Sequence, residues 1–148
     1  MTTFRRVFAF GTFDGVHRGH RVYLRQAKAA GDHLTVVVAR DCNVIRAKGR
    51  PPRYSERERL ALIQDCGESI DRVILGTPGD PLDIFKHEPI DVVILGYDQV
   101  LSEAAVQKAA AMSGQQLVVE RARSFVPGLF SNRLLYRLGR LGRWLRAL

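Results

Sequence analysis

Two histidines, His17 and His20, lie three positions apart within the segment FGTFDGVHRGH at residues 10–20. The segment joins an apolar run to a stretch of helical period, and glycines in such a junction let the backbone approach a ligand closely. The helix start would supply unpaired N–H groups, and both imidazoles could donate hydrogen bonds to phosphoryl oxygens from the same face. The segment predicts a phosphate-binding site. The alternative is that both histidines cap the helix or pack in the core.

Short apolar runs alternate with longer segments of helical period, which is typical of a mostly parallel sheet with crossover helices. The runs predict strands at residues 7–10, 34–39, 72–75, 92–95 and 116–119. Helices are predicted at residues 19–30, 55–66, 81–86 and 102–113, with Ser55 and Ser102 as N-caps. We therefore expect a three-layer, Rossmann-like α/β fold with a five-stranded parallel sheet and helices on both faces.

Ligands in such sheets bind beyond the carboxyl ends of the strands, where the strand order reverses. Residues 11–20, 40–53 and 96–99 follow the first, second and fourth predicted strands and contain polar side chains that could form a site. No helix is predicted between residues 40 and 54.

Length and composition favour one domain, because the chain has 148 residues of which 46% are hydrophobic. The net charge of +8 is concentrated at residues 121–148, which hold seven arginines and no acidic residue, whereas residues 1–120 carry sixteen basic and fifteen acidic side chains. A nucleic-acid-binding surface across the whole chain is therefore not indicated. No apolar run suits a membrane span and no signal peptide is evident, so a cytoplasmic protein is expected. Cys42 and Cys66 lack metal-site spacing and are expected to be free thiols.

The segment GTFDGVHRGH at residues 11–20 resembles the HxGH signature of the cytidylyltransferase-like nucleotidylyltransferase superfamily. ARD at residues 39–41, KGRPP at 48–52 and GYDQ at 96–99 are similar to the archaeal type of FAD synthase in particular. The resemblance covers about residues 4–136. It implies an enzyme that transfers a nucleoside monophosphate from ATP or CTP to a phosphorylated small molecule and releases pyrophosphate, with Mg²⁺ on the triphosphate.

For the acceptor, the resemblance favours FMN, which with ATP would give FAD. Glycerol 3-phosphate with CTP is the alternative pair of substrates. A further alternative is a nucleotide- or RNA-binding module that has kept the fold without turnover.

The resemblance also implies roles for individual residues. His17, His20 and Lys48 would stabilise the charge on the transferred phosphoryl group, and a flexible ammonium suits a triphosphate whose charge moves during the reaction. The residues implied in nucleotide binding are Thr12, Phe13, Asp14, Arg59, Asp98 and Ser131.

Simpler interpretations exist for most of these residues. Lys48 could be a solvated loop charge, and Arg59 could belong to a salt-bridged helix face. Asp14 and Asp98 could be turn or helix-capping residues, and Phe13 could pack in the core.

We expect an α/β domain at residues 1–130 and, as part of the same domain, a basic amphipathic helix at residues 131–148. Where the family has a run of Ser and Thr that holds the triphosphate, this chain has Ser131, Asn132 and Arg133. Only Ser131 keeps the hydroxyl. The helix is expected to pack on the domain or on a second subunit of a homodimer. Contact with an anionic membrane or RNA is the alternative.

Overall fold

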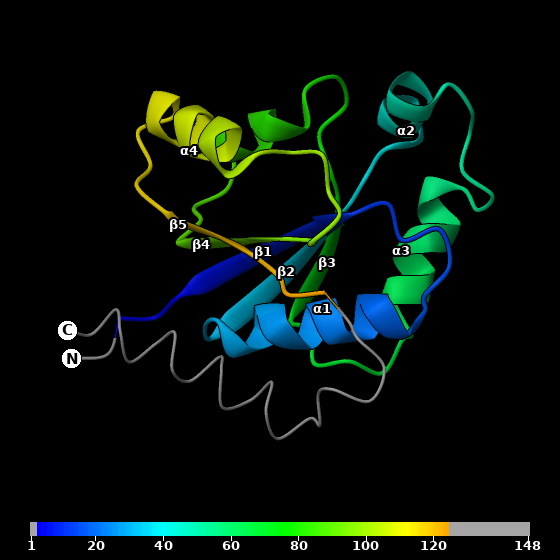
Figure 1. Ribbon diagram of the computed structural model, residues 1–148, viewed down its shortest axis with the longest axis horizontal. Coiled ribbons are helices and arrows are strands. Elements are labelled where there is room, and N and C mark those ends of the chain that lie inside the picture. The colour runs from blue at the N-terminus through cyan, green and yellow to red at the C-terminus, as the bar shows by residue number, and fades with distance from the viewer. Residues whose placement is uncertain (1–2, 125–148) are drawn as a thin grey trace.

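The computed structural model describes residues 3–124 of the chain (Figure 1). Its elements, in chain order, are β1 (Arg6–Gly11), α1 (Arg18–Ala29), β2 (His33–Val38), α2 (Asp41–Lys48), α3 (Glu56–Gln64), β3 (Arg72–Leu75), the 3₁₀ helix η1 (Pro81–Lys86), β4 (Val92–Leu95), α4 (Glu103–Met112) and β5 (Val118–Arg121). The predictions for Ser131 and for a helix at residues 131–148 lie outside the described residues.

The five strands form one parallel sheet in the order β3-β2-β1-β4-β5. Ala9 in the central strand β1 lies opposite Val36 on one side and Ile94 on the other. The chain adds β2 and β3 on one side of β1 and then β4 and β5 on the other. The strand order therefore reverses between β1 and β4, and their carboxyl ends mark the expected ligand position.

Helices cover both faces of the sheet, as predicted, and α1 and α4 lie on opposite sides of it in Figure 1. Leu24 of α1 and Ile63 of α3 are buried against one face, and Phe85 of η1 and Val106 of α4 are buried against the other. The strands are rich in Val, Ile and Leu because both of their faces are covered. Ser55 and Ser102 cap α3 and α4, which confirms both predicted N-caps.

The helix α2 was not predicted from the sequence, so the expectation of no helix between residues 40 and 54 is wrong. The reason is physical. The helix has only eight residues, and Val44 is its one buried side chain. A helix of two turns with a single buried position gives almost no periodic signal. Gly49, at φ 74°, ends it in the left-handed conformation that glycine adopts readily. Within the described part of the chain, no helix is both long and apolar enough to cross a membrane.

Candidate active site

The two histidines of the sequence motif cap the first helix through a reciprocal pair of contacts. His17 is the N-cap of α1, and its Nδ1 accepts hydrogen bonds from the backbone N–H groups of Gly19 (3.0 Å) and His20 (3.4 Å). In return, Nδ1 of His20 accepts from the backbone N–H of His17 at 3.4 Å. This is the geometry of a capping box, here built from two imidazoles.

Capping uses only one nitrogen of each ring. Because each Nδ1 accepts a hydrogen bond, the proton of each neutral ring resides on Nε2. The capping box thus leaves Nε2 as the donor nitrogen of both His17 and His20. The two interpretations of the motif, helix capping and phosphate binding, are therefore compatible.

The imidazoles stack on each other with ring centroids 3.7 Å apart and an interplanar angle of 22°. Burial lowers the pKa of His20 to about 4, and the neighbouring His17 lowers it in the same direction. A hydrogen bond with the Gly15 backbone and the charge of Asp98 act in the opposite direction. His20 is accordingly a neutral hydrogen-bond donor near pH 7, and Asp98 lies close enough to affect it electrostatically.

The depressed pKa of His20 predicts a loss of stability in mild acid. An unfolded chain takes up a proton on this histidine near its ordinary pKa of about 6.5, whereas the folded protein does so only near about 4. Between those values the unfolded state binds more protons, so the free energy of unfolding falls as the pH falls. Thermal unfolding of the wild type and of His20→Gln, followed from about pH 7 down to about pH 5, should show a steeper decline for the wild type. Parallel declines would contradict this assignment.

Phe13 belongs to residues 10–20, which we call the histidine segment, and its side chain packs in the core against His20. Its side chain is 2% exposed and its backbone has a φ of 54°, which is unusual for a residue other than glycine. The ring packs edge to face on His20, with centroids 5.2 Å apart, and stacks on Tyr23. A Cβ at Gly11 would lie 2.6 Å from this ring, so only glycine fits there. The side chain of Phe13, a residue expected in nucleotide binding, lies in the core.

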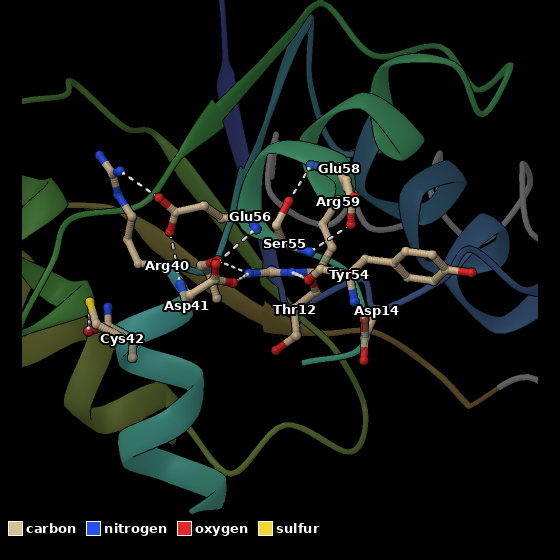
Figure 2. Close-up of polar contacts among 12 residues, drawn as sticks. Thr12, Asp14, Arg40, Asp41, Cys42, Tyr54, Ser55, Glu56, Glu58 and Arg59 are labelled. Atoms are coloured by element: carbon tan, nitrogen blue, oxygen red, sulfur yellow. Dashed lines mark hydrogen bonds and ion pairs between the residues drawn. The ribbon is translucent and has the colours of Figure 1, made fainter. Parts of the chain in front are cut away.

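Arg59 has internal partners for its guanidinium, which is completely buried. It donates hydrogen bonds to the carbonyls of Thr12 (2.7 Å), Ala39 (2.8 Å) and Tyr54 (3.0 Å) and to Oδ1 of Asp41 (2.7 Å) (Figure 2). Three loops at the carboxyl edge of the sheet are thereby joined through one side chain. We interpret Arg59 as a residue that positions these loops, because its donors face the protein and not an open site.

Asp14 also connects two loops. Its carboxylate accepts hydrogen bonds from the backbone N–H groups of Arg53 (2.8 Å) and Tyr54 (2.9 Å), and these bonds lower its pKa (Figure 2). A third connection joins Asp41 and Glu56, each of which accepts a hydrogen bond from the other's backbone N–H. The sequence motif ARD contains Asp41, but nothing in the sequence indicated that it pairs with the buried Arg59.

A cavity of about 320 Å³ opens between the histidine segment, α2 and the loop before α3. The cavity is lined by Thr12, Asp14, Val44, Lys48, Arg50, Pro51, Pro52 and Arg53. We call this the cationic cavity, because three of its residues carry a positive charge and one a negative charge. It brings Lys48 together with Thr12 and Asp14, as expected for residues of one site, and it suits an anionic ligand.

Asp98 lies in the loop that follows β4 and acts electrostatically on His20. The neighbouring Gln99 donates a hydrogen bond to the carbonyl of Phe10 and accepts one from the backbone N–H of Gly96 (3.1 Å). The hydroxyl of Tyr23 accepts from the N–H of Phe10 (3.0 Å) and donates to the carbonyl of Ile94. Two side chains therefore connect the ends of β1 and β4 at the point of strand reversal. Sequence reasoning assigned neither Tyr23 nor Gln99.

Among residues 3–124, no group of three or more histidine, cysteine, aspartate or glutamate side chains could hold a metal ion. The carboxylate of Asp14 is already occupied by two backbone N–H groups. Mg²⁺ commonly binds through substrate phosphates and water and not through an all-protein cage.

The geometry is that of a Rossmann-like domain with two histidines at the first strand-to-helix junction. A family model described as Cytidylyltransferase-like matches residues 8–134, and the chain belongs to this family. It is 45% identical to FAD synthase from Thermoplasma volcanium over 102 residues, which is 69% of this chain and 70% of the relative. It is 36% identical to FAD synthase from Thermoplasma acidophilum over 130 residues, or 88% and 90% of the two chains.

A solved structure is also similar to this protein. The lipopolysaccharide core biosynthesis protein from Thermoplasma volcanium superposes with a TM-score of 0.76 at 39% sequence identity. The similarity covers 84% of this chain and all of that one. The resemblance to the cytidylyltransferase-like superfamily and the predicted fold class are thus confirmed.

Proposed function

We propose that the protein is an FMN adenylyltransferase, which joins the AMP portion of ATP to the phosphate of FMN and yields FAD and pyrophosphate. The observation that carries the proposal is the pair of histidines at the N-terminus of α1, in the same segment as Thr12 and Asp14, which line the cationic cavity. This arrangement suits phosphoryl chemistry on an anionic substrate. The choice of FMN and ATP rests on the relatives named FAD synthase.

In the proposed reaction, a phosphate oxygen of FMN attacks the α-phosphorus of ATP in line. A new P–O bond forms while the bond from the α-phosphorus to the bridging oxygen breaks, and the electron pair leaves with pyrophosphate. A phosphate is already ionised near neutral pH, so the protein needs no strong base. Its contribution is to position the reactants and to stabilise the charge on the transferred group.

Different residues bind the transferred phosphoryl group, the other phosphates and the nucleoside. Nε2 of His17 and of His20 donates hydrogen bonds to the oxygens of the transferred phosphoryl group. Lys48 neutralises phosphate charge from the cationic cavity, and Asp98 faces the nucleoside part of ATP. Mg²⁺ neutralises charge when it is bound to the triphosphate.

Replacing Lys48 by Ala should raise the KM for at least one of the two phosphorylated substrates about tenfold, the size of effect expected from one charge-assisted contact. Lys48 is exposed at the end of α2, so its loss should leave the fold unchanged. Arg57→Ala is the matched control, because Arg57 is an exposed cation on the neighbouring helix α3 and does not line the cavity. Steady-state kinetics of both variants provide the measurement. Equal KM values in K48A and R57A would exclude Lys48 from substrate binding.

Substrate identity can be tested by measuring pyrophosphate release with Mg²⁺ and ATP or CTP, each combined with FMN, glycerol 3-phosphate or phosphopantetheine. The proposal predicts turnover with ATP and FMN. Turnover confined to CTP with glycerol 3-phosphate would replace it with the alternative cytidylyltransferase activity. Nucleotide binding without release from any pair would instead favour a non-catalytic module.

A further inference from the structure

Arg121, the last residue of β5, reaches across the end of the neighbouring strand to the loop formed by residues 96–101. Its guanidinium donates hydrogen bonds to the carbonyls of Gly96 (2.8 Å), Gln99 (3.0 Å) and Leu101 (2.7 Å). It also forms an ion pair with Glu103, the first residue of α4. One side chain therefore binds the beginning, middle and end of this loop and connects the loop to the helix that follows.

Side chains of the loop give it only part of its order, since Leu101 is partly buried against the core and Gln99 contacts the end of β1. Tyr97 is 56% exposed and Val100 is fully exposed, so neither side chain anchors the loop in the core. Ordering an irregular segment costs about 1–2 kcal/mol of conformational entropy per residue, which must be offset by specific contacts. A planar guanidinium suits this task, because its N–H groups are fixed in a fork that can reach several carbonyls at once.

A second contact attaches the loop to the end of β1. Gln99 donates to the carbonyl of Phe10, at the end of β1 and directly before the histidine segment. Asp98 lies between these two attachments, and its charge acts on His20. The position of Asp98 relative to the histidines therefore depends on contacts made by Gln99 and Arg121, while its own side chain is exposed.

We propose that Arg121 is a positioning residue for the nucleotide, holding the loop 96–101 in the conformation that presents Asp98 to the nucleoside half of ATP. Arg121 itself does not touch the substrate. The inference rests on the proposed function, because that function places the nucleoside beside Asp98.

The first test measures the order of the loop without any substrate. In Arg121→Ala, amide hydrogen exchange followed by mass spectrometry should be at least about tenfold faster over residues 96–101 and unchanged in β1 and α1. Arg72→Ala is the matched control: Arg72 also lies on an edge strand and pairs with a glutamate, Glu88, but contacts none of this loop. Unchanged exchange over residues 96–101 in R121A would overturn the proposal.

The second test separates positioning from a general effect on folding. R121A should raise the KM for ATP about tenfold and leave the KM for FMN within about twofold, and Arg121→Lys should restore part of the loss. Asp98→Ala should give a similar rise, and the double variant should be no worse than the single ones because both changes act through one contact. Equal rises in both KM values, or additive effects, would overturn the positioning role.

The two tests also distinguish this inference from the proposed function. If the wild-type protein shows no transfer from ATP to FMN, the proposed function fails together with the positioning of ATP. Hydrogen exchange then still decides whether Arg121 orders the loop, because it requires no catalysis.

Discussion

Replacing His17 by Asn is expected to lower kcat about 100- to 1,000-fold while leaving the protein folded, the loss seen when one donor to a developing oxyanion is removed. Asparagine is among the best N-cap residues, so its side-chain oxygen can accept the N–H bonds that Nδ1 of His17 accepts now. The imidazole Nε2–H is lost in this variant and the helix cap is kept.

His20 allows the same separation of structure from chemistry. Glutamine at the third helical position completes a capping box, so His20→Gln can still accept from the backbone N–H of His17. We expect kcat to fall to a similar extent, with the thermal midpoint near that of the wild type at about pH 7.

Alanine variants serve as the matched controls for both histidines. His17→Ala removes the cap and the donor together, and loss of a cap costs about 1 kcal/mol of stability. Steady-state kinetics and thermal unfolding of H17N and H17A should therefore show equal losses of activity and unequal losses of stability. If H17N kept nearly full activity while H17A lost it, the ring would act only as a helix cap.

Arg59→Ala should reduce the free energy of unfolding by about 3–5 kcal/mol, because three backbone carbonyls lose their donor at about 1–3 kcal/mol each, and the ion pair with Asp41 adds less because Asp41 is 35% exposed. The substitution leaves Asp41 without its buried cation and three backbone carbonyls without their donor. Those carbonyls belong to three different loops of the site, so activity should fall together with stability.

Arg57→Ala supplies the comparison for this prediction, since Arg57 lies two residues away on the same helix and is exposed. Its free energy of unfolding should lie within about 0.5 kcal/mol of the wild type. Urea denaturation measures both variants, and Arg59→Lys should be intermediate because an ammonium cannot reach four acceptors in a fork. An R59A variant as stable as R57A would contradict the joining role of Arg59.

The sheet and the histidine segment could be predicted because their signals are local. Runs such as the one at residues 34–39 have the composition of strands that are covered on both faces. The glycines and histidines at residues 10–20 lie where a strand turns into a helix, and the structure has that junction. The expected position of the site, at the carboxyl edge of the sheet, followed from the fold class alone.

The sequence does not show which of Arg57 and Arg59 is buried and which is exposed. Both belong to the segment ERER, which is typical of a solvated helix face with ion pairs. Residues two apart in a helix point about 200° away from each other, so one arginine faces solvent and the other faces the core. Which one is buried depends on how α3 packs against β2 and β3, and its partner Asp41 lies in the helix that was not predicted.

Arg121 illustrates a second limit. In the sequence it belongs to a basic segment without acidic residues, which suggests a solvated charge. In the structure it contacts a loop that lies 20 to 25 positions earlier in the chain, because β5 pairs with β4. Only the pairing of the strands reveals this contact, and the charge pattern gives no sign of it.

We expect a nucleotidyl group, and not a terminal phosphate, to move from ATP to FMN. This transfer can be tested by incubating the protein with FMN and Mg²⁺ and with ATP that is radiolabelled at either the α- or the γ-phosphate. The α-label is expected in FAD and the γ-label in pyrophosphate, and both should decrease with H17N and H20Q. Recovery of the γ-label in a flavin product, or as free phosphate with no label in FAD, would contradict this expectation.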